Sequence, residues 1–252
     1  MTLPAGFAIM SLGLFDRGGR LPYEISRLWT WSILKIGRIR LKVQGLERLD
    51  PHRAYVFIAN HQSNLDIPVL VQGLSRFQLR WVAKKELLYI PWFGWALWAS
   101  GNIVVDRSNR AKAIAGLRKA REKIEKGSSV VFFAEGTRSS SGKLLPFKSG
   151  GFLLALRTRT PIVPITIRGS GAILPKGDWR IREGDIEVIV NEPVLTDAFH
   201  RRDLSVLVNL VRQVMESSLK QRPISPVNET GGAEVVAASE VVLERGGSNG
   251  FA

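Results

Sequence analysis

A histidine and an aspartate five residues apart form the first pair in this sequence that could carry out a reaction. His61 and Asp66 follow a short apolar run. A neutral imidazole whose Nδ1–H is held by a carboxylate can accept a proton at its other nitrogen, as a general base acting on a hydroxyl must. Residues at this spacing do not face each other within one regular helix, so the chain must fold back where a helix starts, with Ser63 or Asn64 as its N-cap. The alternative is that His61 caps this helix and Asp66 complements its positive end.

Three further segments place polar or proline residues at the ends of strand-like runs. Asp106 and Arg107 close one run, and the residues Phe-Ala-Glu-Gly-Thr-Arg-Ser close another at 133–139. An arginine fork suits phosphate oxygens, Glu135 could accept from a polyol hydroxyl, and backbone N–H groups around Gly136 could add donors. Taken singly, either segment is explained more simply by an Arg–Glu ion pair that braces a loop. The last segment, 160–165, indicates only the start of an apolar strand.

The elements that must position these residues alternate along the chain. Strand patterns occur at 39–43, 55–59, 77–82, 102–105, 130–133, 162–167 and 186–190. Helix patterns occur at 21–36, 110–126, 151–159 and 203–220. This alternation predicts an α/β domain in which helices cover a largely buried sheet, with its sites where strands run into polar loops.

Composition limits the kinds of chemistry and partner. The chain has 252 residues and no cysteine, which excludes disulfides, a cysteine nucleophile and thiolate metal sites, and its three histidines are too scattered to suggest a metal site. The net charge of +14 indicates an anionic partner. The segment 223–252 is rich in Gly, Ser and Ala, and we expect it to be a disordered tail. Without that tail, residues 1–222 carry a net charge of +17, so the basic character belongs to the folded part of the chain, whose main domain we place at 39–222.

The N-terminal segment, 1–38, has features of a membrane-docking region and no convincing signal peptide. Several apolar or small residues of 21–36 fall near one helical stripe, and lysines and arginines follow. The stripe consists of Leu21, Ile25, Leu28, Trp29, Ser32, Leu34 and Ile36. A core helix with a basic exit would show the same periodicity. The uncharged stretch 87–105 is interrupted by Pro and Gly and rich in Trp, which favours a membrane interface over a membrane span.

The ordered set of motifs is more specific than any member of it. Segments 60–66, 101–107, 133–139 and 161–165 resemble, in order and spacing, the four motif blocks of the glycerolipid acyltransferase family, most closely the 1-acyl-glycerol-3-phosphate acyltransferases. The linking segments 83–94 and 145–150 resemble that family as well. The resemblance extends over about 41–167, and it implies a glycerol-3-phosphate-acyltransferase-like sheet covered by helices. Ala134 departs from the family, many members of which have proline there.

The resemblance also implies a reaction, in which an acyl group passes from acyl-CoA or acyl carrier protein to the sn-2 hydroxyl of lysophosphatidic acid to give phosphatidic acid. His61 would be the base and Asp66 the group that orients it. The residues carried over to the acceptor, with Lys84 the weakest, are Lys84, Arg107, Glu135, Gly136, Thr137 and Arg138. No metal or cofactor is implied, and a thioester is activated enough for direct attack by a hydroxyl without an acyl-enzyme.

The remaining expectations concern acceptor and location. Other lyso-lipids, including lyso-ornithine lipid, are alternative acceptors. Two anionic substrates with long acyl chains, a basic domain and the aromatic segments predict a peripheral or monotopic enzyme on the cytoplasmic face of an anionic membrane. A non-catalytic module that binds anionic lipid would explain the charge but not the His–Asp pair. Nucleic acid is not an expected partner, because no nucleic-acid-binding motif accompanies the charge.

Overall fold

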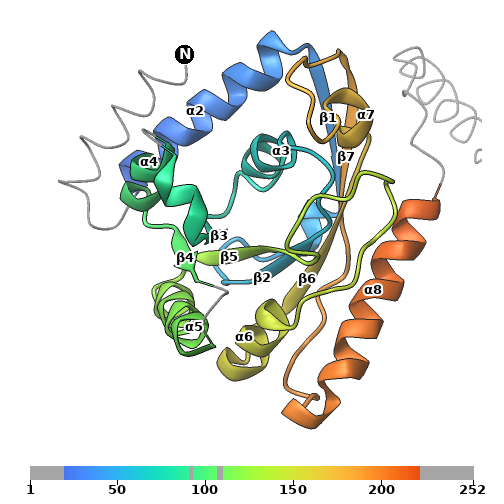
Figure 1. Cartoon of the computed structure of the whole chain (residues 1–252). Coiled ribbons are helices and arrows are strands. Elements are labelled where there is room, and N and C mark those ends of the chain that lie inside the picture. Colours follow the sequence, from blue (N-terminus) through green and yellow to red (C-terminus); the bar gives the residue numbers. More distant parts are fainter. Residues whose placement is uncertain (1–19, 91–92, 107–109, 222–252) are drawn as a thin grey trace, which may run out of the picture. The chain divides into compact units, whose positions relative to one another are not determined.

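The structure is a computed structural model that describes residues 20–90, 93–106 and 110–221 (Figure 1). The chain divides into two units, residues 1–220 and 221–252, and the first contains every element described below. The predicted domain 39–222 and tail 223–252 place their boundary within two residues of this division, although 222–252 lies outside the described residues.

A seven-stranded mixed sheet forms the centre of the first unit, in the order β1-β7-β6-β2-β5-β3-β4. All neighbouring strands are parallel except β6 and β7, which are antiparallel. The strands are β1 (Ile39–Gln44), β2 (Val56–Ala59), β3 (Leu79–Lys84), β4 (Ile103–Val105), β5 (Ser129–Phe133), β6 (Ile162–Arg168) and β7 (Gly184–Val190). The predicted α/β class is therefore confirmed, and every expected strand is present.

Helices cover both faces of the sheet (Figure 1). The α-helices are α2 (Arg20–Ile36), α3 (Asp66–Gly73), α4 (Phe93–Ala99), α5 (Arg110–Glu125), α6 (Gly150–Thr158), α7 (Ser170–Ile173) and α8 (Leu204–Lys220). Short 3₁₀ turns are η1 (Leu46–Arg48), η2 (Lys85–Tyr89) and η3 (Arg201–Asp203). The apolar cores show the layers, because α2, α3 and α7 pack with Phe57 on one face, whereas α5, α6 and α8 pack with Val56 and Ile58 on the other.

This two-sided packing explains the short apolar runs that marked the strands. All four residues of β2 are buried, and successive side chains of a strand point to opposite faces. A strand covered on both faces must be apolar at every position, so it shows no alternation with polar residues. The loops that carry His61 and Glu135 leave the sheet where β2 and β5 end side by side, with Ala59 paired to Phe133.

Helix α2 differs from the predicted stripe in one respect. Leu34 is buried with Tyr23 and Thr30 on the face turned towards the domain, whereas Leu21, Leu28 and Ile36 are exposed. The expectation that Leu34 shares one stripe with those residues is therefore wrong, because six residues place Leu34 about 120° around the helix from Leu28, on the buried face. Among the described residues, no helix combines the length and apolarity that crossing a bilayer requires.

Candidate active site

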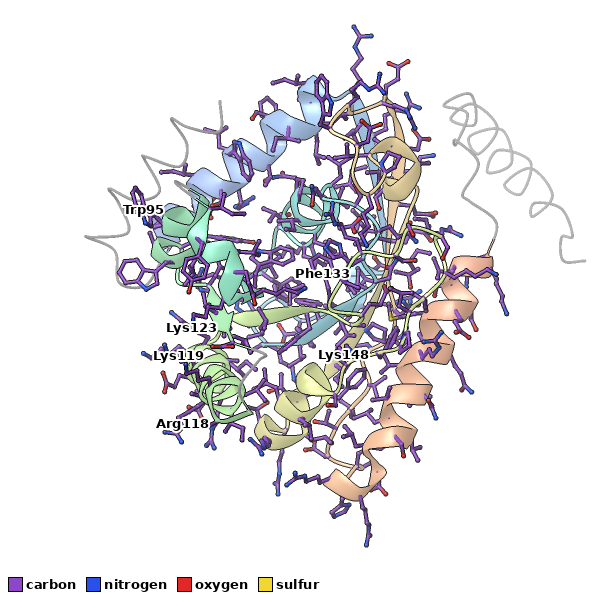
Figure 2. All side chains as sticks on the ribbon, in the orientation of Figure 1. Trp95, Arg118, Lys119, Lys123, Phe133 and Lys148 are labelled. Atoms are coloured by element: carbon purple, nitrogen blue, oxygen red, sulfur yellow. The ribbon has the colours of Figure 1, made fainter. Side chains whose placement is uncertain are left out.

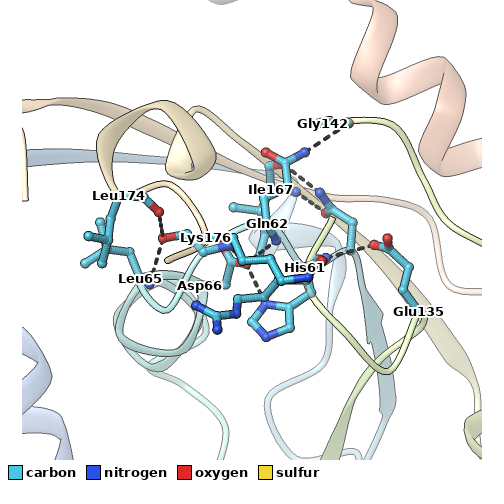
Figure 3. Close-up of polar contacts among 12 residues, drawn as sticks. His61, Gln62, Leu65, Asp66, Glu135, Gly142, Ile167, Leu174 and Lys176 are labelled. Carbon is cyan, nitrogen blue, oxygen red and sulfur yellow. Dashed lines mark hydrogen bonds and ion pairs between the residues drawn. The ribbon is translucent and has the colours of Figure 1, made fainter. Parts of the chain in front are cut away.

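His61 and Asp66 meet as their spacing predicted. The His61 Nδ1 and Asp66 Oδ2 atoms are 2.7 Å apart (Figure 3). Asp66 is the first residue of α3 and is fully buried, while the His61 ring remains partly accessible. Because a carboxylate can only accept, Nδ1 carries the proton and Nε2 is left as the acceptor. The pair therefore has the geometry of a general base with its orienting group.

The turn between the two residues is built by Asp66 itself. Its Oδ2 also accepts the backbone N–H groups of Gln62 at 2.7 Å and Ser63 at 2.9 Å. The prediction that Ser63 or Asn64 is the N-cap is wrong, because Leu65 occupies that position and makes no side-chain cap. The Ser63 hydroxyl instead accepts the Leu65 N–H and donates to the carbonyl of Leu174, where it anchors the turn to the segment after α7.

An aromatic stack supports the imidazole. The ring of Phe133, the last residue of β5, lies parallel to that of His61, with centroids 3.7 Å apart and planes within 10°. Trp81 of β3 also stacks against Phe133, with ring centroids 5.8 Å apart and ring planes 28° apart. Sequence analysis missed both aromatic residues. The available signal was the position of Phe133 directly before the polar loop, whereas nothing local marks Trp81.

Glu135 is placed to brace the loops. It is buried, its Oε1 accepts the His61 backbone N–H at 3.0 Å, and its Oε2 accepts that of Leu145 at 3.0 Å. Burial raises the pKa of Glu135, and these two N–H groups oppose the shift. Both oxygens are engaged with the backbone, so the geometry favours a positioning role over the predicted contact with an acceptor hydroxyl.

The loop after β5 lies directly over the histidine loop. The Ser139 N–H donates to the His61 carbonyl at 2.8 Å, and the Gln62 amide donates to the Gly142 carbonyl at 3.2 Å. Gly136 makes the turn possible with a positive φ of 69°. Thr137 is exposed at this turn. The hydrogen bonds that Ser139 and Glu135 make to the His61 backbone place the predicted acceptor loop 135–138 beside the dyad.

The predicted phosphate-binding residues Lys84, Arg107 and Arg138 differ in where the structure places them. Arg138 is partly buried in the loop over the histidine, and Lys84 is exposed at the end of β3. Arg107 lies outside the described residues. Lys176, between α7 and β7, was missed by sequence analysis, and its ammonium donates to the Arg138 carbonyl at 3.2 Å (Figure 3). No motif spacing marks Lys176, because the fold brings it in from a distant segment.

No group of three or more histidine and acidic side chains in the described part of the chain is arranged to hold a metal ion.

Comparison with known proteins identifies the family. A model of the family described as Acyltransferase matches residues 40–168. The chain belongs to the acyltransferase family. It is 38% identical over 184 residues to the chloroplastic 1-acyl-sn-glycerol-3-phosphate acyltransferase BAT2 of Brassica napus, a match that covers 72% of this chain and 53% of that protein. The human 1-acyl-sn-glycerol-3-phosphate acyltransferase alpha is 34% identical over 193 residues, covering 76% and 68%.

A solved structure supports the same assignment. The crystal structure of the 1-acyl-sn-glycerophosphate acyltransferase PlsC from Thermotoga maritima superposes with a TM-score of 0.72 and 26% identity, covering 88% of this chain and 92% of that one. The chain spans about half the length of the first curated relatives it matches. The resemblance predicted from the four motifs is thus confirmed, and the family match contains His61, Asp66 and the loop 135–138.

Proposed function

We propose that this acyltransferase transfers an acyl group from acyl-CoA or acyl carrier protein to the sn-2 hydroxyl of lysophosphatidic acid, producing phosphatidic acid. The observation that carries the proposal is the His61–Asp66 pair at 2.7 Å, with the second imidazole nitrogen available as an acceptor. The names of the relatives support the choice of acceptor, because each is a 1-acyl-sn-glycerol-3-phosphate acyltransferase.

The reaction proceeds in a ternary complex. His61 Nε2 removes the proton of the acceptor hydroxyl, and the oxygen attacks the carbonyl carbon of the thioester. The C–S bond of the tetrahedral adduct then breaks, and the imidazolium returns the proton to the leaving thiolate. The buried charge of Asp66 stabilises the imidazolium between these steps. No covalent acyl-enzyme forms, so detection of an acyl-serine by mass spectrometry would contradict this mechanism.

The phosphate of the acceptor lies among the cations near the dyad. Arg138 and Lys176 are joined through the Arg138 carbonyl and bring two positive charges to the loop over the histidine. Arg107 and, more weakly, Lys84 are carried over from the family motifs, and Gly136 and Thr137 complete the acceptor loop. Glu135 acts by holding this loop against the histidine backbone.

The enzyme docks on the cytoplasmic face of an anionic membrane as a peripheral or monotopic protein. Support comes from α2, whose outward face carries exposed apolar side chains, and from the aromatic segment around α4. The exposed residues are Leu21, Leu28, Trp31, Ile36, Tyr89, Trp95 and Trp98. Aromatic side chains of this kind favour the headgroup region of a bilayer.

The decisive experiment measures labelled phosphatidic acid formed from lysophosphatidic acid and acyl-CoA by the wild type and by His61→Ala. Parallel reactions use acyl carrier protein as donor and lyso-ornithine lipid as acceptor. We expect product from lysophosphatidic acid and loss of at least 100-fold in rate on removal of the base, within the usual range of about 10²–10⁴ for general base catalysis. Product from lyso-ornithine lipid alone would replace the acceptor and keep the mechanism. No product with any pair would favour a non-catalytic lipid-binding module.

A further inference from the structure

Helix α5 presents three cations that form no ion pair with another described residue. Arg118 and Lys119 are exposed and Lys123 is half-buried. Across the described part of the chain, none of these three side chains forms an ion pair or hydrogen bond, whereas Arg121 of the same helix pairs with Glu125. Lys119 and Lys123 are four residues apart, a spacing at which like charges destabilise a helix. The stability of α5 therefore does not explain the cations.

Lys123 lies against a second, buried cation. A methyl group added to Gly101 would lie 3.2 Å from the Lys123 Nζ and 3.8 Å from the Arg80 Nε. Arg80 is only 1% exposed and donates to the carbonyl of Ser100, directly after α4, at 3.1 Å. Burial, and next the charge of Arg80, lower the pKa of Lys123. We call Arg80, Gly101, Lys119 and Lys123 the cationic corner.

Aromatic and apolar side chains flank the cationic corner. The Trp98 carbonyl accepts the Gly101 N–H at 3.0 Å, and the Trp98 side chain is 66% exposed. Helix α2 also lies near Arg80. Its Tyr23 hydroxyl donates to the Phe77 carbonyl, and burial raises the pKa of Tyr23 to about 12, whereas the nearby charge of Arg80 lowers it. Trp95 of α4 and the cations of α5 lie on one side of the view in Figure 2.

The cationic corner is separate from the His–Asp pair. Arg80 pairs with Val130, which pairs with Val56, whereas Phe133, which stacks on His61, pairs with Ala59, three residues further along the strands. At about 3.3 Å per strand residue, the two levels are roughly 10 Å apart along the strand direction. An anion bound at the cationic corner is therefore different from the acceptor phosphate that we assign to Arg138 and Lys176.

We propose that the cationic corner binds the phosphate groups of anionic phospholipids when the enzyme sits on a bilayer. Lys119 and Lys123 contact the headgroup phosphates, Arg80 adds its buried positive charge, and Trp98 lies at the level of the headgroups. The flanking aromatic and apolar side chains favour a lipid surface over an acidic protein partner, which would need charge complementarity but not exposed tryptophan. The inference rests on the membrane docking proposed above and not on the acyl-transfer chemistry.

The test is co-sedimentation of the full chain with vesicles. Lys119→Gln/Lys123→Gln is compared with the wild type on vesicles of phosphatidylcholine alone and with 30% phosphatidylglycerol. Arg201→Gln/Arg202→Gln, which removes two charges from η3, is the matched control. A lysine near an anionic surface contributes a factor of about five in binding, so we expect the α5 variant to bind the anionic vesicles roughly 30-fold more weakly. Its binding to neutral vesicles stays within about twofold of the wild type, because phosphatidylcholine has no net negative charge to attract the lysines. The control also stays within about twofold, because it leaves the cationic corner intact.

Further variants separate the possible failures. Lys119→Gln alone, at an exposed position, gives about a fivefold loss without disturbing the fold, and Trp98→Ala weakens binding to neutral and anionic vesicles alike. If the α5 variant and the η3 control lost the same amount of binding to anionic vesicles, the proposed role of the cationic corner would be wrong, and general charge attraction would explain the binding. Loss of binding to an acyl carrier protein with vesicle binding unchanged would assign the corner to that protein instead. Wild-type activity in neutral detergent micelles tests the acyl transfer separately.

Discussion

At the level of single residues, Asp66 makes its hydrogen bonds through one of its two carboxylate oxygens. Its Oδ2 accepts from the His61 ring and from two backbone N–H groups, while its buried Oδ1 has no hydrogen-bond partner among the described residues. Full burial removes the solvent that would otherwise screen the charge. The carboxylate therefore both fixes the imidazole tautomer and builds the turn that presents it.

Replacing Asp66 by Asn tests the tautomer. The neutral amide removes the charge that stabilises the imidazolium, and it can donate to Nδ1, which would place the proton on the wrong nitrogen. We expect kcat for acyl transfer to fall by about 10²–10⁴, with a much smaller change in KM for lysophosphatidic acid. Steady-state kinetics at saturating acyl donor measure the effect. A loss of less than tenfold would show that Asp66 has only a structural role.

The stack on Phe133 predicts a smaller effect on the same step. Phe133→Leu removes the ring that lies parallel to His61, and aromatic pairs of this kind contribute about 0.5–1.5 kcal/mol. We therefore expect kcat to fall by roughly two- to tenfold, with KM unchanged. Phe133→Tyr keeps the ring and is the control. A loss in Phe133→Tyr equal to that in Phe133→Leu would point to packing and not to the stack.

Glu135 predicts a pH dependence of stability. Because burial raises its pKa in the folded protein, the folded state binds this proton more tightly than the unfolded state, and its contribution to stability falls as pH rises from about 4.5 through the raised pKa. Glu135→Gln removes this dependence. The Gln amide has only one oxygen, so one of the two backbone N–H groups that Glu135 accepts would face the amide NH₂ group and lose its acceptor. This lowers the free energy of unfolding by about 1–3 kcal/mol.

Urea unfolding at pH 5 and pH 8 measures both effects of Glu135→Gln. The free energy of unfolding of the variant should fall less between these pH values than that of the wild type. An identical change in the two proteins would mean that Glu135 does not titrate differently in the folded and unfolded states.

At the level of elements, α2 has two apolar faces with different tasks. Leu34 is 7% exposed and packs in the core, whereas Leu28 is 67% exposed on the outward face. We expect Leu34→Ala to lower the free energy of unfolding by about 2–5 kcal/mol and Leu28→Ala to change it by less than about 0.5 kcal/mol. Leu28→Ala should instead weaken co-sedimentation with vesicles. Comparable destabilisation by the two variants would place Leu28 in a core contact.

The sheet positions the site through its central strands. Parallel β2 and β5 end together, so the loops that follow them are adjacent by construction. Asn60 extends this arrangement to β6, since its side chain accepts the Ile167 N–H at 2.7 Å and donates to the Ile167 carbonyl at 2.9 Å. The Asn60 side chain thus forms with β6 the pair of hydrogen bonds that a strand backbone would form, and it fixes the start of the histidine loop against the sheet.

At the level of the whole molecule, the first unit contains both the catalytic pair and the exposed apolar faces, and contacts divide the chain after Lys220. We expect a chain shortened to end at Arg222 to keep the thermal midpoint and acyl-transfer rate of the full chain, because the composition of 223–252 predicts a segment without a core. Calorimetry and the product assay measure these quantities. A fall in midpoint of several degrees would show that the segment packs on the domain.

Much of this protein followed from local sequence. The seven strands and the main helices were recognisable because a buried strand needs an unbroken apolar run and a covering helix needs one apolar face. The meeting of His61 and Asp66 was predictable as well, because a turn joins residues so close in sequence.

Other features depended on pairings between distant segments. The antiparallel direction of β7, the Trp81–Phe133–His61 stack and the arrival of Lys176 all join residues from separate segments of the chain. The face of α2 that turns inward was decided in the same way, since both of its faces are apolar. A local sequence pattern predicts whether a residue is buried, but it does not predict which residue from another segment it contacts. Those contacts are determined only when the strands pair and the helices pack on the sheet.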